Sequence, residues 1–369
     1  MRYLRLFLGW LFSLFFALLA LSMFLLANWV SALLLLLILL ICLPPMTTLL
    51  RTQLDWTLGP TVRVLIVLGL LVFVVRGLPT GEATSIYRTP DVRARMMLIY
   101  EEKLKEWPVP FERTFVHTRY GAIHVIASGP EDAPPLILLH PSGVASWSWR
   151  ASIAELSNHY RTYAIDLIGD AGKSEYYDLR KTVKSGLEQA ELYKEITEKL
   201  GVQRAYVVGA SEGGFVGSNY ALYAPDRVEK LALLGPMGYQ GAVGAIVRIT
   251  LAQLFPLRPV QELTIRWAFS ESEIVEAEMG EWFMLLLSGV YPVKVPPLPF
   301  TPSERRSLQV PVLFVFGGRD RLVGDPMSAA ELVRDVPNSR VELVEAGHLM
   351  ATERPEEINR LLLDFFQDP

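Results

Sequence analysis

The sequence predicts an α/β protein with a mostly parallel sheet and helices on both faces of that sheet. Short apolar segments rich in β-branched residues alternate with helix-compatible segments from about residue 136 to residue 234, and this alternation is typical of βαβ units. One of the expected strands ends in a glycine-rich turn that leads directly into a helix. Residues 1–77 lack this alternation of strand-like and helix-compatible segments and consist mainly of long apolar runs.

The composition separates an apolar, basic N-terminal segment from an acidic remainder of the chain. The chain has 369 residues, is 51% hydrophobic and carries a formal net charge of −4. Residues 1–80 contain five arginines, one aspartate and neither lysine nor glutamate, a net of +4, so the remainder carries −8. This asymmetry is typical of a membrane anchor attached to a soluble domain. No basic patch with interleaved aromatic residues is present in the sequence, which argues against nucleic acid as a partner.

Residues 1–77 are interpreted as a transmembrane anchor. The apolar run 4–43 suits two spans of about 20 residues each, and it exceeds the apolar core of about 7–15 residues of a cleaved signal peptide. A second apolar run at 64–75 is either a third span or an interfacial helix, so two or three helices are expected. We therefore expect an integral protein of the cell membrane that contacts the lipid bilayer. Arginines flank the spans on both sides, which leaves the side of the catalytic domain open.

The next segment, residues 78–106, is expected to be a polar linker followed by an amphipathic helix. Proline and glycine interrupt its first part, and apolar residues recur along one helical side from residue 91. The strands expected after this segment are 112–117, 122–127, 136–139, 160–167, 205–208, 230–234, 310–316 and 340–346. Helices are expected at 187–200 and 354–366. Residues 236–308 break the alternation of strands and helices.

The segment Gly209-Ala-Ser-Glu-Gly213 places Ser211 between an expected strand and an expected helix. The two glycines lack Cβ atoms, so strand and helix can approach each other around a turn that holds the serine in strained backbone geometry. Such a turn exposes a serine hydroxyl above the sheet and aims backbone N–H groups of the new helix at it. A helix N-cap serine is the alternative interpretation of the motif by itself.

A serine nucleophile needs a general base and an acid that orients that base. His348 is the only histidine that follows Ser211 in the chain, and it lies where a strand pattern breaks into a loop. Asp320 directly ends a buried-strand pattern, whereas Asp325 lies five residues further into the same loop. We therefore expect Asp320 to be the acid, with Asp325 as the alternative.

These motifs, in this order, resemble the serine hydrolases of the α/β-hydrolase fold, and bacterial carboxylesterases in particular. The resemblance covers about residues 107–366 and defines a catalytic domain at 107–369. It implies that 236–308 is a helical cap that roofs the active site. The catalytic residues that it implies are Ser211, Asp320 and His348.

The resemblance also implies an oxyanion hole with two backbone N–H donors. One is the N–H of Glu212, and the other belongs to the loop after the strand 136–139, most simply Ser142. Pro141 stands where the family usually has glycine and has no N–H, so Gly143 is the alternative donor. A glutamate after the nucleophile is unusual: its carboxylate either raises the pKa of His348 or faces outward and pairs with a cation of the cap.

Further residues near these motifs are expected to have structural roles. His140 is interpreted as a loop residue and not as a second base. Asp166 and Asp170 resemble the family's structural aspartate loop. Most aromatic residues of 236–308 are expected to form the core of the cap, with one or two lining the substrate pocket; they are Trp267, Phe269, Trp282, Phe283 and Tyr291.

The expected function is hydrolysis of carboxylic esters through an acyl-enzyme. Cleavage of C–C bonds, lipids or thioesters by the same fold is the alternative among enzymes, and a catalytically silent, membrane-tethered binding module is the alternative of another class. The expected partners are a small ester or acyl substrate and the bilayer, with no cofactor and no metal. Cys42 is the only cysteine, so an intramolecular disulfide is excluded. Natural substrate and oligomeric state are left open.

Overall fold

The computed structural model describes residues 85–240, 243–254 and 257–368, together with a few isolated positions between 14 and 38. The chain divides into two compact units, Met1–Ala83 and Thr84–Pro369. Apart from those isolated positions, the predicted transmembrane anchor lies outside the described residues. Among the helices that the structure describes, none combines the length and the hydropathy needed to cross a bilayer.

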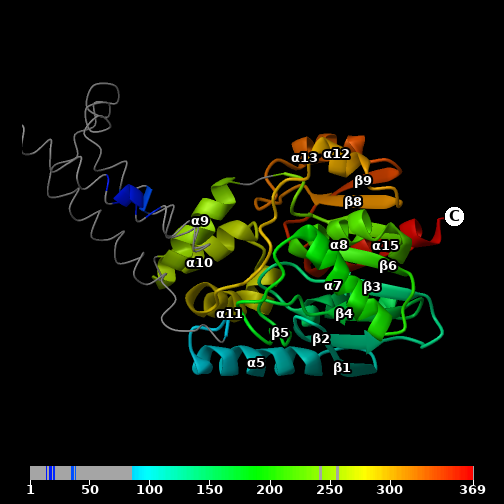
Figure 1. Ribbon diagram of the computed structural model, residues 1–369, viewed down its shortest axis with the longest axis horizontal. Coiled ribbons are helices and arrows are strands. Elements are labelled where there is room, and N and C mark those ends of the chain that lie inside the picture. The colour runs from blue at the N-terminus through cyan, green and yellow to red at the C-terminus, as the bar shows by residue number, and fades with distance from the viewer. Residues whose placement is uncertain are drawn as a thin grey trace, which may run out of the picture. The chain divides into compact units, whose positions relative to one another are not determined.

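One sheet organises the second unit. Within the described residues it has nine strands in the order β1-β2-β4-β3-β6-β7-β8-β9, with β5 paired to β2. The pairs β1-β2, β2-β4 and β2-β5 are antiparallel, and all pairs from β4 through β3 to β9 are parallel. Figure 1 shows the strands running from β1 at one edge of the sheet to β9 at the other. The strands are β1 (Phe111–His117), β2 (Gly121–Ser128), β3 (Pro135–Leu139), β4 (Arg161–Ile165), β5 (Glu175–Tyr176), β6 (Ala205–Ala210), β7 (Val228–Leu234), β8 (Val312–Gly317) and β9 (Ser339–Val344).

Helices separate the parallel strands in the chain, as the alternation predicted. The α-helices are α5 (Pro90–Lys105), α6 (Arg150–Leu156), α7 (Gly186–Lys199), α8 (Glu212–Tyr223), α9 (Val243–Leu254), α10 (Arg258–Ala268), α11 (Glu273–Gly289), α12 (Pro302–Arg306), α13 (Pro326–Leu332), α14 (Met350–Glu353) and α15 (Pro355–Gln367). Short 3₁₀ helices are η1 (Ser146–Trp149), η2 (Pro225–Arg227) and η3 (Val333–Asp335). Helix α5 precedes β1, and α14 and α15 follow β9.

The parallel strands bury both of their faces. Successive strand residues point to opposite sides, so Leu136 and Leu138 of β3 join one core cluster while Ile137 and Leu139 join the other. The first cluster also contains buried residues of α5, α6, α11 and α15, and the second contains residues of α7, α8 and α13. Helices therefore cover both faces, which confirms the predicted α/β architecture with a mostly parallel sheet.

Helix α5 packs as part of the second unit. Thr89 caps its N-terminus by accepting a hydrogen bond from the Val92 N–H, and Met96 and Tyr100 are fully buried. Ion pairs join it to α11, for example Lys103 to Glu278 at 2.9 Å. The predicted amphipathic helix is thus tied to the cap as well as to the sheet.

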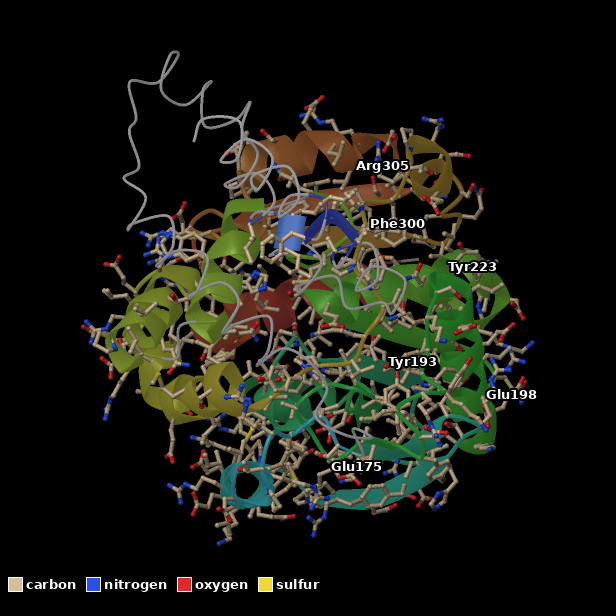
Figure 2. The ribbon with its side chains drawn as sticks, turned by 60° about the vertical axis from the view of Figure 1, so that its left-hand side comes forward. Glu175, Tyr193, Glu198, Tyr223, Phe300 and Arg305 are labelled. Atoms are coloured by element: carbon tan, nitrogen blue, oxygen red, sulfur yellow. The ribbon has the colours of Figure 1, made fainter. Side chains whose placement is uncertain are left out.

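The predicted cap segment, 236–308, contains α9, α10 and α11, then an extended strap (residues 291–301), and then α12. The rings of Phe269 and Phe283 lie 4.4 Å apart between centroids, inside the first core cluster. Arg305 of α12 donates to the Phe300 carbonyl at 2.8 Å and also pairs with Asp335, and these bonds fix the end of the strap (Figure 2). Phe269, Trp282 and Phe283 are thus buried in a core that the cap segment shares with the sheet, whereas Tyr291 is 49% exposed.

Candidate active site

Ser211 occupies the turn between β6 and α8 in a backbone conformation that side chains rarely adopt. Its φ is 52° and its ψ is −112°, a strained geometry that persists only where the surroundings enforce it. A Cβ on Gly209 would lie 2.3 Å from the Gly213 carbonyl oxygen, and one on Gly213 would lie 2.2 Å from the Leu139 oxygen. The two glycines of the motif are therefore required by close backbone contacts, as the sequence predicted.

His348 and Asp320 form a buried hydrogen-bonded pair. The Nδ1 atom of His348 lies 2.7 Å from Oδ2 of Asp320, and their side chains are 4% and 2% exposed. The other carboxylate oxygen of Asp320 accepts the backbone N–H groups of Leu322 at 2.8 Å and Val323 at 3.2 Å. Because Nδ1 faces a carboxylate, the Nε2 atom of His348 is left to act on a second group.

The fold brings Ser211 and this pair to the same edge of the sheet. Strands β6, β7, β8 and β9 are consecutive neighbours and parallel, so their carboxyl ends meet there. The Ser211 N–H donates to the Leu234 carbonyl at the end of β7, and a Cβ on Gly235 would lie 3.1 Å from Oδ2 of Asp320. Within the part of the chain that the structure describes, the Ser211 hydroxyl makes no hydrogen bond of its own, which is common before substrate binds.

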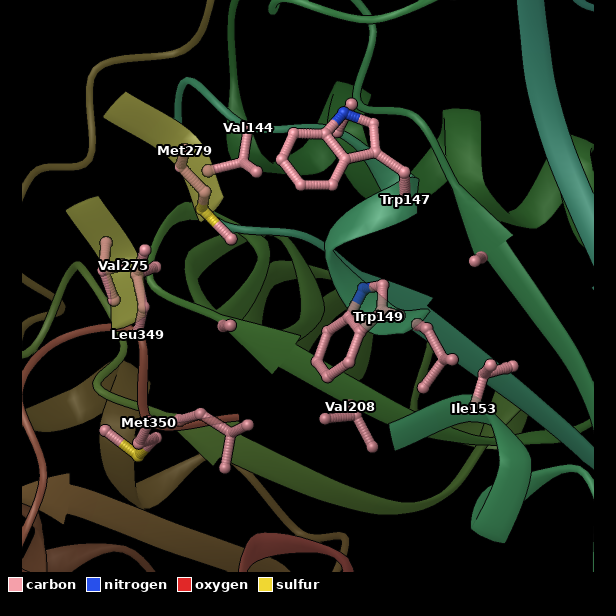
Figure 3. Close-up of a cluster of buried hydrophobic side chains, with 14 of the residues drawn as sticks. Val144, Trp147, Trp149, Ile153, Val208, Val275, Met279, Leu349 and Met350 are labelled. Atoms are coloured by element: carbon pink, nitrogen blue, oxygen red, sulfur yellow. The ribbon is translucent and has the colours of Figure 1, made fainter. Parts of the chain in front are cut away.

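A small apolar cavity lies beside His348. Its volume is about 20 Å³, enough for one water molecule. Trp149 forms one wall, and Figure 3 shows it above Val208 of β6, with Leu349 and Met350 to the left in the view. The lining residues are Pro141, Ser148, Trp149, Ala210, Leu234, His348, Leu349, Met350, Ala351 and Thr352.

The loop after β3 holds the candidate second oxyanion donor. The Gly143 N–H donates to Oδ2 of Asp170 at 2.8 Å, and its carbonyl accepts from Nε1 of Trp282 at 2.8 Å. Within the described residues, the backbone N–H groups of Ser142 and Glu212 have no hydrogen-bond acceptor. Gly143 is thus already engaged, whereas Ser142 and Glu212 have free donors at this edge of the sheet.

Glu212 is buried, so its carboxylate does not face outward as one of the alternatives from the sequence had it. It is 4% exposed, and its carboxylate forms an ion pair with Lys294 of the strap. Pairing with a cation of the cap was one of the two predicted alternatives, but it was expected at the surface, and Lys294 itself was not named from the sequence. The only signal for Lys294 was a single charge within a proline-rich, otherwise apolar stretch.

Charges around Lys294 shift the protonation of this cluster. Burial raises the pKa of Glu212, and the nearby ammonium of Lys294 opposes that shift. Burial by itself would lower the pKa of Lys294, but the carboxylates of Asp170 and Glu212 outweigh it and raise that pKa. Lys294 is therefore held in its charged form.

The remaining sequence-predicted residues have structural contacts. Asp325 is the N-cap of α13, where its carboxylate accepts the Ser328 N–H at 2.8 Å. His140 accepts the Leu167 N–H at Nε2, at 2.9 Å. Asp166 is buried against Tyr100 and His124. The structure thus pairs His348 with Asp320 and places Asp325 at a helix terminus.

The sequence profile of the alpha/beta hydrolase family matches residues 136–361, which is more than half of the chain. The chain belongs to the alpha/beta hydrolase family. It is similar to carboxylesterase YbfK of Bacillus subtilis (strain 168), with 33% identity over 294 residues that span 73% of this chain and 93% of that protein. The uncharacterized carboxylesterase nap of the same organism is 30% identical over 305 residues, which span 78% of this chain and 97% of nap.

The same likeness holds in three dimensions. The crystal structure of naproxen esterase (carboxylesterase NP) from Bacillus subtilis superposes with a TM-score of 0.70 at 30% identity, covering 76% of this chain and 99% of that one. Fold and relatives together support an enzyme that hydrolyses ester bonds.

Proposed function

We propose that the protein is a membrane-anchored serine hydrolase that cleaves carboxylic esters through Ser211, His348 and Asp320. The observation that carries this proposal is the 2.7 Å contact between Nδ1 of His348 and Asp320, at the sheet edge where the strained Ser211 turn ends β6. The similarity to proteins named carboxylesterases supports an ester as the substrate.

The proposed reaction proceeds in two halves. Nε2 of His348 accepts the Ser211 proton as Oγ attacks the ester carbonyl, and Asp320 stabilises the imidazolium that forms. The tetrahedral intermediate expels the alcohol, which takes the proton from His348, and leaves an acyl group on Ser211. Water then attacks the acyl carbonyl with the same base, releasing the carboxylic acid and restoring the hydroxyl.

The proposed oxyanion donors are the backbone N–H groups of Ser142 and Glu212. Both lack an acceptor within the described residues, whereas Gly143 donates to Asp170. An N–H that already serves a carboxylate is a poorer donor for a transient oxyanion, so the geometry favours Ser142 over Gly143. Each such donor stabilises the transition state by about 3–4 kcal/mol.

The nucleophile is tested with Ser211→Ala. The variant should lose hydrolysis of 4-nitrophenyl esters of increasing acyl length and labelling by a fluorophosphonate, with an unchanged circular dichroism spectrum. Ser307→Ala is the matched control, since its hydroxyl bonds only to the Ser303 carbonyl of its own short helix, and it should keep both activities. Labelling that persists in Ser211→Ala at another serine would refute the nucleophile, and a parent protein that neither hydrolyses nor labels would indicate a silent binding module.

We also propose that residues 1–77 hold the protein in the cell membrane. The proposal rests on the apolar run 4–43 in the sequence. The full-length protein should stay in the membrane pellet in carbonate or high salt and be released by detergent. Release by salt alone would show that surface charge, and not apolar segments, attaches it.

A further inference from the structure

Lys294 connects the two walls of the candidate oxyanion hole. It lies in the strap, and its ammonium contacts the Glu212 carboxylate, the Ser142 hydroxyl and, at 3.4 Å, Oδ2 of Asp170. Glu212 begins α8 directly after the nucleophile, whereas Ser142 belongs to the loop after β3. One side chain of the cap thus joins the residues whose backbone N–H groups we assign to the oxyanion.

The two carboxylates of this cluster differ in how they are compensated. Asp170 accepts backbone N–H groups from Gly143 at 2.8 Å and Ala171 at 2.7 Å, in addition to its contact with Lys294. Glu212 accepts no backbone hydrogen bond among the described residues; the Ser142 hydroxyl hydrogen-bonds its carboxylate, and Lys294 is the cation that contacts it. Because Glu212 is only 4% exposed, water contributes little to its stabilisation. Its charge therefore depends on Lys294.

The position of Glu212 gives this dependence a chemical consequence. The residue presents a donor N–H to the candidate oxyanion site, yet its own side chain carries the sign of charge that an oxyanion also develops. Two like charges a few ångströms apart in a partly desolvated site repel each other far more strongly than in water. A neutralised Glu212 leaves the donor effective, and an ionised, unpaired Glu212 opposes the transition state.

We propose that Lys294 is a positioning residue for ester hydrolysis, which neutralises the Glu212 carboxylate beside the oxyanion hole and holds that wall against Ser142. The proposal rests on the proposed function, because it uses the oxyanion donors assigned there. Lys294 does not touch the reacting atoms in this scheme. It acts through Glu212.

Other titratable groups facing Glu212 do not replace Lys294. Tyr193 of α7 and Tyr176 of β5 lie near the carboxylate (Figure 2 shows Tyr193). Burial raises the pKa of Tyr176 to about 12 and that of Tyr193 above its ordinary value, so both phenols stay neutral near neutral pH. Asp170 is itself acidic. Lys294 is the positive charge available to Glu212 in the described part of the chain.

The test compares Lys294→Met with Lys103→Met in the full-length protein. Lys103 is a partly buried lysine of α5 that pairs with Glu278 of α11, and it belongs to neither the proposed triad nor the oxyanion donors. Glu278 keeps Arg150 as a second partner, so this variant measures the loss of an ion pair of the cap. Lys294→Met should lower kcat by about 10- to 100-fold with little change in KM, less than the loss of a whole oxyanion donor. Lys103→Met should keep its kcat.

A pH profile separates charge neutralisation from a loss of packing. Without Lys294 the pKa of Glu212 rises further, so the carboxyl is neutral at low pH and becomes an unpaired charge as pH increases. The ratio of variant to parent kcat should therefore fall as pH rises. A ratio that is the same at every pH would overturn the neutralising role.

A second pair of variants tests the role through Glu212. In a Glu212→Gln background, where no charge needs neutralising, adding Lys294→Met should change kcat by less than about threefold. An equally large loss in that background, or a folded Lys294→Met with the kcat of the parent, would overturn the proposal. Fluorophosphonate labelling of Ser211 should persist in Lys294→Met. If the proposed function is wrong, the parent protein itself should not be labelled at Ser211.

Discussion

Replacing Asp320 with asparagine should invert the hydrogen bond that orients the catalytic histidine. Oδ1 of Asp320 is fixed by the backbone N–H groups of Leu322 and Val323. An asparagine that keeps these two bonds through its oxygen must turn its amide NH₂ toward Nδ1 of His348, where Oδ2 now lies at 2.7 Å. Nδ1 then has to accept, the proton moves to Nε2, and the histidine is no longer able to take the Ser211 proton.

The expected magnitude is large for activity and small for stability. In a serine protease triad the same substitution lowers kcat about 10⁴-fold, which corresponds to about 5.5 kcal/mol of transition-state stabilisation. Shape and backbone hydrogen bonds are retained here, so the free energy of unfolding should change by less than about 1.5 kcal/mol. Single-turnover acylation with a 4-nitrophenyl ester, alongside urea unfolding, measures both quantities.

Asp325→Asn is the matched control for this substitution. Asp325 caps α13 through the Ser328 N–H, and asparagine caps helices about as well as aspartate, so acylation and stability should both remain close to the parent. A loss of acylation near 10⁴-fold in Asp325→Asn, with Asp320→Asn still active, would refute the assignment of the acid.

Two further predictions follow from the same geometry. Gly235→Ala should lower kcat by about tenfold or more and the melting temperature modestly, since Gly235 has a φ of 50° and its new Cβ would lie 3.1 Å from Oδ2 of Asp320 and 3.6 Å from Nδ1 of His348; unchanged esterase kinetics would contradict it. Burial would raise the pKa of Asp166, but His124 and backbone donors lower it below its ordinary value. Its ionised form therefore stabilises the fold above the unfolded carboxyl's pKa of about 3.9, and this contribution is lost as pH falls through the folded-state pKa. Asp166→Asn should unfold at a lower urea concentration than the parent near neutral pH, and its free energy of unfolding should fall less than that of the parent when the pH is lowered. If the free energies of unfolding of the two proteins changed in parallel with pH, this prediction would be contradicted.

The sheet and the nucleophile turn were predictable because their signals are local. Apolar runs of β-branched residues gave the parallel strands, and Gly209 and Gly213 marked a turn in which backbones approach closely. The preference for Asp320 over Asp325 followed from the place where β8 ends, and in the structure it is Asp320 that contacts His348. Each of these inferences required only a few neighbouring residues.

The surroundings of the site were less predictable because they depend on contacts between distant segments. Glu212 lies in the first turn of α8, where an acidic residue is favoured at the surface by the helix dipole. It is buried because a lysine 82 residues further along the chain reaches it from the strap. The strap has no periodic pattern, so its path depends on how α11 and α12 pack. Similarly, α5 has its own helix signal, but its ion pairs with α11 are set by the tertiary fold.

The strand that carries the nucleophile is more firmly held in the sheet than the strand that precedes the base. Strand β6, which presents Ser211, has paired strands on both sides, whereas β9 pairs with β8 alone among the strands that the structure describes. Backbone amides of an edge strand open through local fluctuations, and those of central strands open only when the whole sheet unfolds. In hydrogen–deuterium exchange, β9 should therefore take up deuterium well before β6. His348 follows β9, so we expect heating to displace the base while the nucleophile turn is still folded, and esterase activity to be lost at a lower temperature than the melting temperature.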